Sequence, residues 1–243
     1  MSSPLEAVDR NVAMVTGLGC RAANFAPFVE LSEMFGDDAA IQLVDGAQFV
    51  GDRLTVISPL AQAEMILGAT SPEEKLLIIS HSIGIAAGME CIEKRPPGQT
   101  QVIAIAPPLP TPATGVRQAV FLDRLKRLEG EFSFPSFSFA TDGEQDLRKK
   151  GKATADVIIS PAYFTEVDSL SEGFAEKVLE QTSKGRLQIV AANNDWNTVA
   201  FADAGRYENT LFIDAPHSLY LPQDELRVVC AAIYNHAMKH HAT

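Results

Sequence analysis

The sequence contains few basic side chains: 20 Lys and Arg stand against 31 Asp and Glu, which gives a formal net charge of −11. Binding to DNA or RNA requires positive charge opposite the phosphate backbone. No basic stripe offsets the excess of acidic residues, and the two small basic clusters, residues 149–152 and 239–241, are typical of solvated surface. We therefore expect no nucleic-acid partner.

The sequence also lacks long apolar segments and has few cysteines. No apolar run approaches the roughly 18 residues that a membrane span requires, and residues 1–10 lack the basic and apolar regions of a signal peptide. The three cysteines, Cys20, Cys91 and Cys230, are odd in number and are not spaced like metal ligands. We predict a cytoplasmic protein with reduced thiols, no metal site and no membrane contact.

Short β-type runs alternate with helical patterns in the first part of the chain. Apolar runs predict strands at residues 11–16, 39–44, 75–80 and 101–106. Apolar residues at helical spacing predict helices between them, at residues 22–35, 55–67 and 83–93. This alternation is typical of a largely parallel sheet covered by helices, and a chain of 243 residues is long enough to bury such a core.

The pattern changes between residues 107 and 185. This segment begins with a proline-rich stretch, has helical patterns at 116–128 and 171–182, and contains seven of the thirteen phenylalanines. Strand and helix patterns resume after it, at residues 187–192, 198–207, 210–213 and 224–239. We therefore predict an insertion within one domain, with the core formed by residues 1–106 and 186–243 and a cap formed by residues 107–185.

Ser82 lies in the pentapeptide Ser80–His81–Ser82–Ile83–Gly84, between an apolar strand and a helix of small residues. The pattern resembles the G-x-S-x-G nucleophile elbow of the α/β-hydrolase superfamily, with Ser80 in place of the first glycine. Small residues on either side of the serine let the strand and the helix approach at a sharp turn, which lifts the hydroxyl above the sheet edge. We interpret Ser82 as a nucleophile; a serine in an ordinary strand-to-helix loop is the alternative.

A serine nucleophile needs a general base, and the sequence has five histidines. His81 lies inside the elbow and is expected to point away from the neighbouring hydroxyl. The histidines at positions 236, 240 and 241 lie at the end of the last predicted helix, where solvated side chains are expected. His217 follows a short strand and precedes that helix, which resembles the position of the catalytic histidine in the superfamily. We therefore predict that His217 is the base.

The superfamily order of Ser, Asp or Glu, and His implies an acid between the serine and the histidine. Asp195 follows the predicted strand at 187–192, where the resemblance places the acid. Asp203 lies within a predicted helix and Asp214 still within a strand, so both are weaker candidates. Asp195 would hold the histidine tautomer and stabilise the imidazolium ion.

Thr16–Gly17–Leu18–Gly19 follows the first predicted strand. It resembles the oxyanion turn of the superfamily, with threonine in place of histidine. The resemblance implies that the backbone N–H groups of Leu18 and Ile83 stabilise negative charge on the carbonyl oxygen of the substrate. A phosphate-binding loop is the alternative for a glycine-rich turn, but neither G-x-G-x-x-G nor a P-loop lysine follows, so we discount nucleotide binding.

The resemblance spans residues 16–217 and implies a mostly parallel α/β sheet of about eight strands, flanked by helices, with a helical cap inserted after the sixth strand. It implies no metal and no organic cofactor, and hydrolysis of a small-molecule ester or thioester through an acyl-Ser82 intermediate. The phenylalanine-rich insertion predicts a pocket for an apolar acyl or aromatic group, although packing within the cap is the alternative role. The candidate pocket residues are Phe132, Phe134, Phe137, Phe139 and Trp196.

Two other function classes stay open at this point, because fold alone does not determine function. One is a non-hydrolytic enzyme on the same scaffold: a lyase, a cofactor-free dioxygenase or a natural-product cyclase. The other is a ligand-binding protein in which the triad is vestigial. The sequence leaves the oligomeric state open.

Overall fold

The main sheet of the computed structural model consists of six parallel strands among the described residues, in the order β10-β9-β6-β5-β1-β2. The strands are β1 (Arg10–Val15), β2 (Ala39–Val44), β5 (Leu76–His81), β6 (Thr100–Ile105), β9 (Leu187–Ala192) and β10 (Leu211–Ile213). The structure describes residues 10–18, 20–50, 53–108, 131–135, 154–158, 163, 166, 173–193, 206–217 and 219–241. The predicted parallel sheet is confirmed, with six described strands where about eight were expected.

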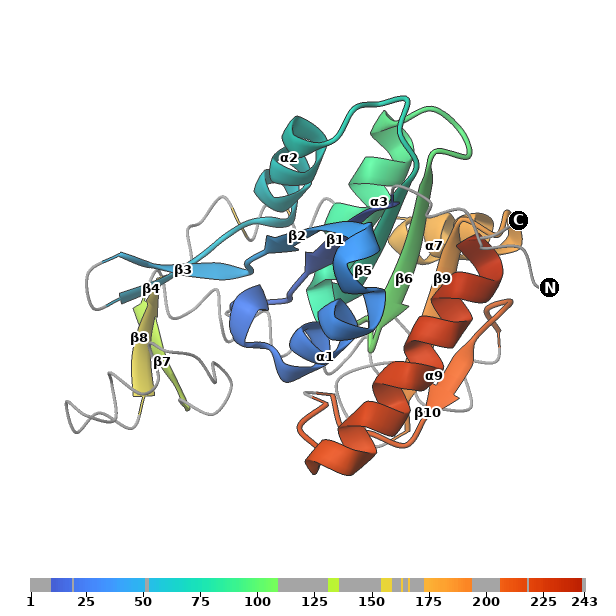
Figure 1. Cartoon of the computed structure of the whole chain (residues 1–243). Helices are drawn as coiled ribbons and strands as arrows, with labels where there is room; N and C mark the ends of the chain where they lie inside the picture. Colours follow the sequence, from blue (N-terminus) through green and yellow to red (C-terminus); the bar gives the residue numbers. More distant parts are fainter. Residues whose placement is uncertain are drawn as a thin grey trace.

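Helices cover both faces of this sheet (Figure 1). One face carries α1 (Ala26–Phe35) and α9 (Gln223–His241), and the other carries α2 (Pro59–Ala69), α3 (Ile85–Lys94) and α7 (Phe174–Ser183). Every residue of β5, β6 and β9 is buried as a result. Burial on both faces explains why these three strands have near-continuous apolar sequences and not an alternating pattern.

A second sheet of four strands lies beside the main sheet, in the order β3-β4-β8-β7 (Figure 1). β3 (Ala47–Val50) and β4 (Arg53–Val56) form an antiparallel hairpin that follows β2. β4 pairs in parallel with β8 (Thr154–Ile158), and β8 pairs antiparallel with β7 (Glu131–Pro135). The second sheet therefore joins a hairpin from the first part of the chain to two strands from the predicted insertion.

The second sheet was not predicted, and it corrects one element. Residues 55–67 were expected to form a single helix, but β4 ends at Val56 and α2 begins at Pro59. Ser58 explains this start, because its side-chain oxygen accepts a hydrogen bond of 3.3 Å from the backbone N–H of Ala61, and proline fits the first turn of a helix.

The predicted insertion is described only in part. The helical pattern at 171–182 corresponds to α7. The buried apolar residues of α7 belong to the core on the face of the main sheet that α2 and α3 cover. The helical pattern at 116–128 lies outside the described residues. The division of the chain at residues 107 and 185 therefore stays a prediction.

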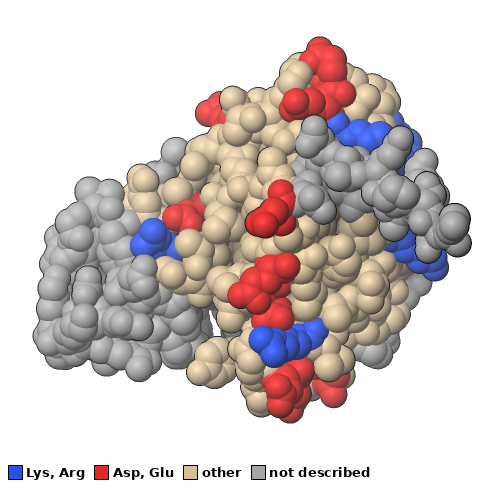
Figure 2. Space-filling model, viewed as in Figure 1, with Lys and Arg blue, Asp and Glu red and all other residues tan. Residues whose placement is uncertain are grey.

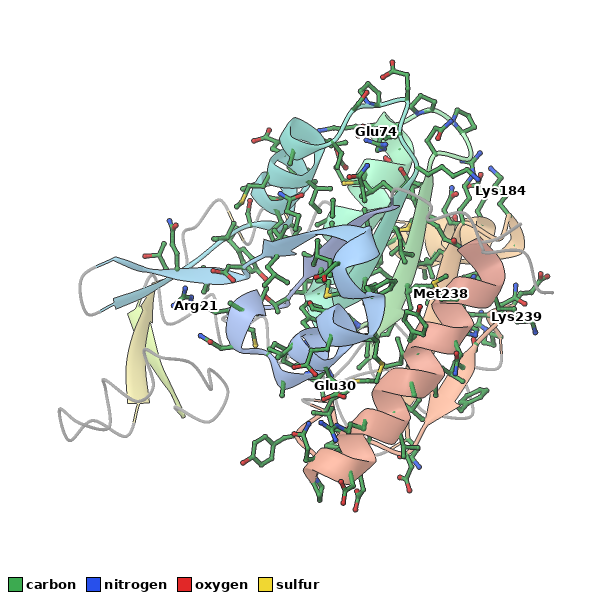
Figure 3. The ribbon with its side chains drawn as sticks, viewed as in Figure 1. Arg21, Glu30, Glu74, Lys184, Met238 and Lys239 are labelled. Atoms are coloured by element: carbon green, nitrogen blue, oxygen red, sulfur yellow. The ribbon has the colours of Figure 1, made fainter. Side chains whose placement is uncertain are left out.

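Glu30 connects the two helices that cover one face of the sheet. The residue is 8% exposed, and its carboxylate accepts hydrogen bonds from Gln223 Nε2 at 2.9 Å and from Arg227 Nε at 3.2 Å. Figure 3 shows Glu30 on α1, beside the first turns of α9. These bonds fix the beginning of α9, the helix that follows the segment containing His217.

The visible face of the molecule carries more acidic than basic side chains (Figure 2), as the net charge of −11 leads one to expect. In the part of the chain that the structure describes, no helix is both long and apolar enough to cross a membrane.

Candidate active site

Ser82 lies at a sharp turn between β5 and α3. Its φ of 55° is in the left-handed region, which a residue with a side chain rarely adopts. The turn passes through a short 3₁₀ helix, Ser82–Gly84, directly after the buried strand. Gly84 is required there because a Cβ at this position would lie 2.9 Å from the backbone oxygen of Val15. The predicted strand–turn–helix context of the serine is therefore present.

Ser80, the departure from the usual elbow pattern, fits its position. Its side chain is 1% exposed, and its hydroxyl donates a hydrogen bond of 3.4 Å to the backbone oxygen of Ile103 on the neighbouring strand β6. A buried hydroxyl is tolerated when it is hydrogen-bonded. Serine therefore replaces glycine here without an unsatisfied polar group.

The structure brings Ser82 and His217 together across 135 positions of sequence. Ser82 Oγ lies 3.0 Å from His217 Nε2, and both side chains are half-buried. When the hydroxyl donates this hydrogen bond, Nε2 is the acceptor, so the imidazole is in the state that can take the serine proton.

The loop that carries His217 is attached to the end of β9. The side-chain oxygen of Asn193 accepts a hydrogen bond of 3.2 Å from the backbone N–H of Ala215, and the Asn193 N–H donates to the oxygen of Ile213 at 3.0 Å. Leu219 has a φ of 50°, and its N–H donates to the oxygen of Pro216 at 3.0 Å. Asn193 was not predicted as a site residue, although its place directly after a buried strand was a usable signal.

The turn after β1 lies against Ser82. A Cβ added to Gly17 would be 2.8 Å from Ser82 Cβ and 3.3 Å from Ser82 Oγ, so only glycine allows this approach. Leu18, the predicted second oxyanion donor, directly follows, and Ile83, the predicted first donor, is the second residue of the 3₁₀ helix that begins at Ser82. The two backbone segments that carry the predicted donors therefore lie next to Ser82, one through the contact of Gly17 and the other through the chain itself.

Two residues that sequence analysis missed hold this turn. Gln62, from α2 and 1% exposed, donates both of its amide protons, to Thr16 O at 2.9 Å and to Asp45 O at 3.0 Å. The backbone N–H of Gly46 reaches Cys20 O at 2.8 Å and Thr16 Oγ1 at 2.9 Å. The turn is thus bonded to α2 and to the segment that leads into β3.

Asp45 and Cys20 lie near the turn, and the carboxylate of Asp45 is held by two contacts. Asp45 Oδ1 accepts a hydrogen bond of 2.6 Å from the N–H of Ala22, and Asp45 Oδ2 lies 3.5 Å from Arg21 Nε. Figure 3 shows Arg21 on the side of the main domain that faces the second sheet. Burial raises the pKa of the Cys20 thiol to about 12, so this thiol stays protonated near neutral pH and is a poor nucleophile.

Several predicted site residues have no described side chain. Asp195 and Trp196 lie outside the described residues, as do Phe137 and Phe139. Phe132 and Phe134 lie in β7, where their backbones stand opposite Val157 and Ala155 of β8. Their roles as acid and as pocket residues stay predictions.

Comparisons with known proteins show similarity of structure only. No protein-family model matches the chain, and no curated protein sequence matches it. A monoacylglycerol lipase from Paleococcus ferrophilus is 18% identical, with a TM-score of 0.59 over 93% of this chain and 94% of that one. Est1E from Butyrivibrio proteoclasticus is 12% identical, with a TM-score of 0.57 over 97% and 89% of the two chains.

A thioesterase domain from the curacin biosynthetic pathway is 14% identical, with a TM-score of 0.56 over 95% of this chain and 92% of that one. The matches extend over nearly the whole of both chains, so they concern the complete architecture and not one motif. Together with the parallel sheet, the helices on both faces and the elbow after the central strand β5, they show that this chain has the fold of the α/β-hydrolase superfamily.

Proposed function

We propose that this protein is a serine hydrolase that cleaves an ester or a thioester through an acyl-Ser82 intermediate. The observation that carries the proposal is the 3.0 Å hydrogen bond between Ser82 Oγ and His217 Nε2, made at a serine whose φ is 55°. A nucleophile within hydrogen-bond reach of its base is the arrangement that acyl transfer requires. The strained backbone supports the same role, because such conformations persist where the surrounding structure enforces them, often at active sites.

The reaction has two halves. Ser82 Oγ attacks the carbonyl carbon of the substrate while its proton passes to His217 Nε2, and the tetrahedral intermediate then releases an alcohol or a thiol, which takes that proton. Water attacks the acyl-serine in the second half and gives a proton to His217. Collapse of the second intermediate releases the carboxylic acid and returns the proton to Ser82.

Two further groups complete the proposed mechanism. Asp195, two positions after Asn193, would accept a hydrogen bond from His217 Nδ1 and hold the ring in the tautomer that the serine needs. The N–H groups of Leu18 and Ile83 would stabilise the oxyanion of both intermediates. The fit of Gly17 against Ser82 supports this, because it brings the turn within van der Waals contact of the nucleophile.

The expected substrates carry an apolar acyl or aromatic group. This part of the proposal rests on the phenylalanines between residues 131 and 139, two of which lie in β7 of the second sheet. Two of the structures that resemble this one are named a lipase and a thioesterase domain. Esters and thioesters are therefore the first two bond types to test.

Labelling with a fluorophosphonate tests the nucleophile directly. In this reaction Ser82 Oγ forms a bond to phosphorus, the phosphorus–fluorine bond breaks, and His217 takes the serine proton. We expect one label per chain, at Ser82 by peptide mass analysis, and no label in Ser82→Ala. We also expect Ser82→Ala to keep well under a tenth of the wild-type rate on p-nitrophenyl and acyl-thioester substrates, because only binding and the oxyanion hole remain.

The control is Ser80→Ala. It removes a buried hydroxyl two positions before Ser82 and leaves the nucleophile in place. It should still be labelled at Ser82. A wild-type protein that folds and stays unlabelled, or a Ser82→Ala protein that keeps more than about a tenth of the rate, would rule out an acyl-Ser82 intermediate.

A further inference from the structure

His81 makes close contacts with the base although it was expected only to point away from the serine hydroxyl. Its side chain is 3% exposed, and its Nε2 lies 2.7 Å from the backbone oxygen of His217. The centroids of the two imidazole rings are 5.0 Å apart. On its other side the His81 ring packs on Phe25, with centroids 4.6 Å apart.

The chemistry of this hydrogen bond settles its direction. A backbone oxygen can only accept, so His81 Nε2 carries a proton and donates it. His81 is the last residue of β5, a strand buried over its whole length and paired with β6 on one side and β1 on the other. The donor is therefore carried by a strand that is held by backbone hydrogen bonds on both sides.

The acceptor belongs to a loop, and loops need such attachments to hold a catalytic group in place. Among the described residues, Asn193 holds the N–H of Ala215, and His81 holds the carbonyl of His217 itself. The attachment by His81 acts on the peptide unit that bears the imidazole. It fixes the base relative to the nucleophile, because His81 and Ser82 are adjacent in the elbow.

We propose, on the basis of the function proposed above, that His81 is a positioning residue that holds His217 at hydrogen-bond distance from Ser82. His81 does not exchange protons with the substrate. Its role is to keep the backbone of the base at a fixed distance from the backbone of the nucleophile, so that the serine proton has an acceptor in line at every turnover.

Three substitutions of His81 separate the hydrogen bond from the packing. His81→Phe keeps a ring against Phe25 and removes the donor. His81→Gln keeps a donor, because its amide nitrogen is the same number of bonds from Cβ as Nε2. His81→Asn also has an amide donor, but one bond too short to reach.

We expect His81→Phe and His81→Asn to lower kcat by about 10- to 100-fold, since a displacement of about 1 Å at a catalytic group costs about that much. KM should stay within about twofold, and fluorophosphonate labelling of Ser82 should slow by the same factor as kcat. His81→Gln should restore most of the rate. Phe25→Leu, the matched control, removes the ring contact but not the hydrogen bond and should leave kcat nearly unchanged.

Equal kcat in the Phe, Asn and Gln variants would overturn the positioning role, as would a loss in Phe25→Leu as large as that in His81→Phe. If His81→Phe does not fold, the Gln and Asn pair decides the same question. The ring ¹⁵N chemical shifts of His81 give a readout that does not depend on catalysis: a proton on Nδ1 and none on Nε2 would refute the hydrogen bond. Wild-type protein that keeps the Nε2 proton but does not react with the probe would instead refute the acyl-serine function, and the positioning role with it.

Discussion

Gly46 is the position where one methyl group should disable the proposed oxyanion turn. A Cβ on Gly46 would lie 1.8 Å from the oxygen of Gly17 and 2.7 Å from its carbonyl carbon. Neither neighbour is the end of a flexible side chain, because both are backbone atoms of the turn that contacts Ser82. Gly46→Ala must therefore push the backbone of Gly17 and Leu18 away by about 1 Å or more, since carbon and oxygen atoms do not approach much closer than 3 Å.

The size of the effect follows from what that displacement does to catalysis. A shift of about 1 Å in a positioned group costs on the order of 100-fold in rate, and loss of one oxyanion donor costs about 100- to 1,000-fold. We expect kcat of Gly46→Ala to fall at least about 100-fold, which equals about 2.7 kcal/mol of transition-state stabilisation. Overpacking should also lower the free energy of unfolding by about 1–3 kcal/mol.

Steady-state kinetics on a p-nitrophenyl ester, with the folded fraction measured by circular dichroism, provides the assay. Gly68→Ala is the matched control: Gly68 lies in α2, and a Cβ there would meet nothing within 4 Å. This control should keep the wild-type kcat and gain about 0.5–1 kcal/mol of stability, because alanine favours helix over glycine. A folded Gly46→Ala protein with wild-type kcat would show that the turn after β1 takes no part in the reaction.

Two more substitutions test the groups around the turn and the base. Gln62→Met keeps the side-chain length but removes both donors, leaving the buried oxygen of Thr16 and the part-buried oxygen of Asp45 without that partner. We expect the free energy of unfolding, measured in urea, to fall by about 2–4 kcal/mol, and kcat to be lower. Unfolding at the wild-type urea concentration would contradict this role. Asp195→Asn should lower kcat on the order of 1,000-fold or more with little change in KM, because the amide can donate to Nδ1 and so favour the wrong histidine tautomer. A kcat within about tenfold of wild type would direct the search for the acid to Asp203 or Asp214.

The main sheet could be predicted from the sequence because its central strands carry their own signal. β5, β6 and β9 are buried on both faces, and each appears in the sequence as one apolar run that ends at a turn. The β3–β4 hairpin has no such signal. Its strands have four residues each, and β4 is completed by β8, about 100 positions later in the sequence. Pairing over that distance leaves no local pattern.

The residues of the candidate site also differ in whether the sequence carries a local signal for them. Ser82 could be predicted because the elbow is a local motif, and His217 because few histidines had to be considered. Gln62 and Gly46 could not, since each acts on the turn through contacts with residues about 30 to 46 positions away. His81 was named for its place in the elbow, but its bond to the His217 backbone spans 136 positions and follows from the tertiary structure alone.

The β3–β4 hairpin is attached to the turn after β1 at Gly46, and this attachment separates changes in the second sheet from changes in the turn. Gly46 immediately precedes β3, and its oxygen accepts a hydrogen bond of 3.0 Å from the N–H of Ile57, directly after β4. This bond closes the base of the hairpin at the residue that touches the proposed oxyanion turn. In the part of the chain that the structure describes, β7 and β8 are joined to the hairpin by the pairing of β8 with β4, beyond that closed base. Side chains on β7 can therefore change without moving Gly17, whereas any change at Gly46 acts on the turn directly.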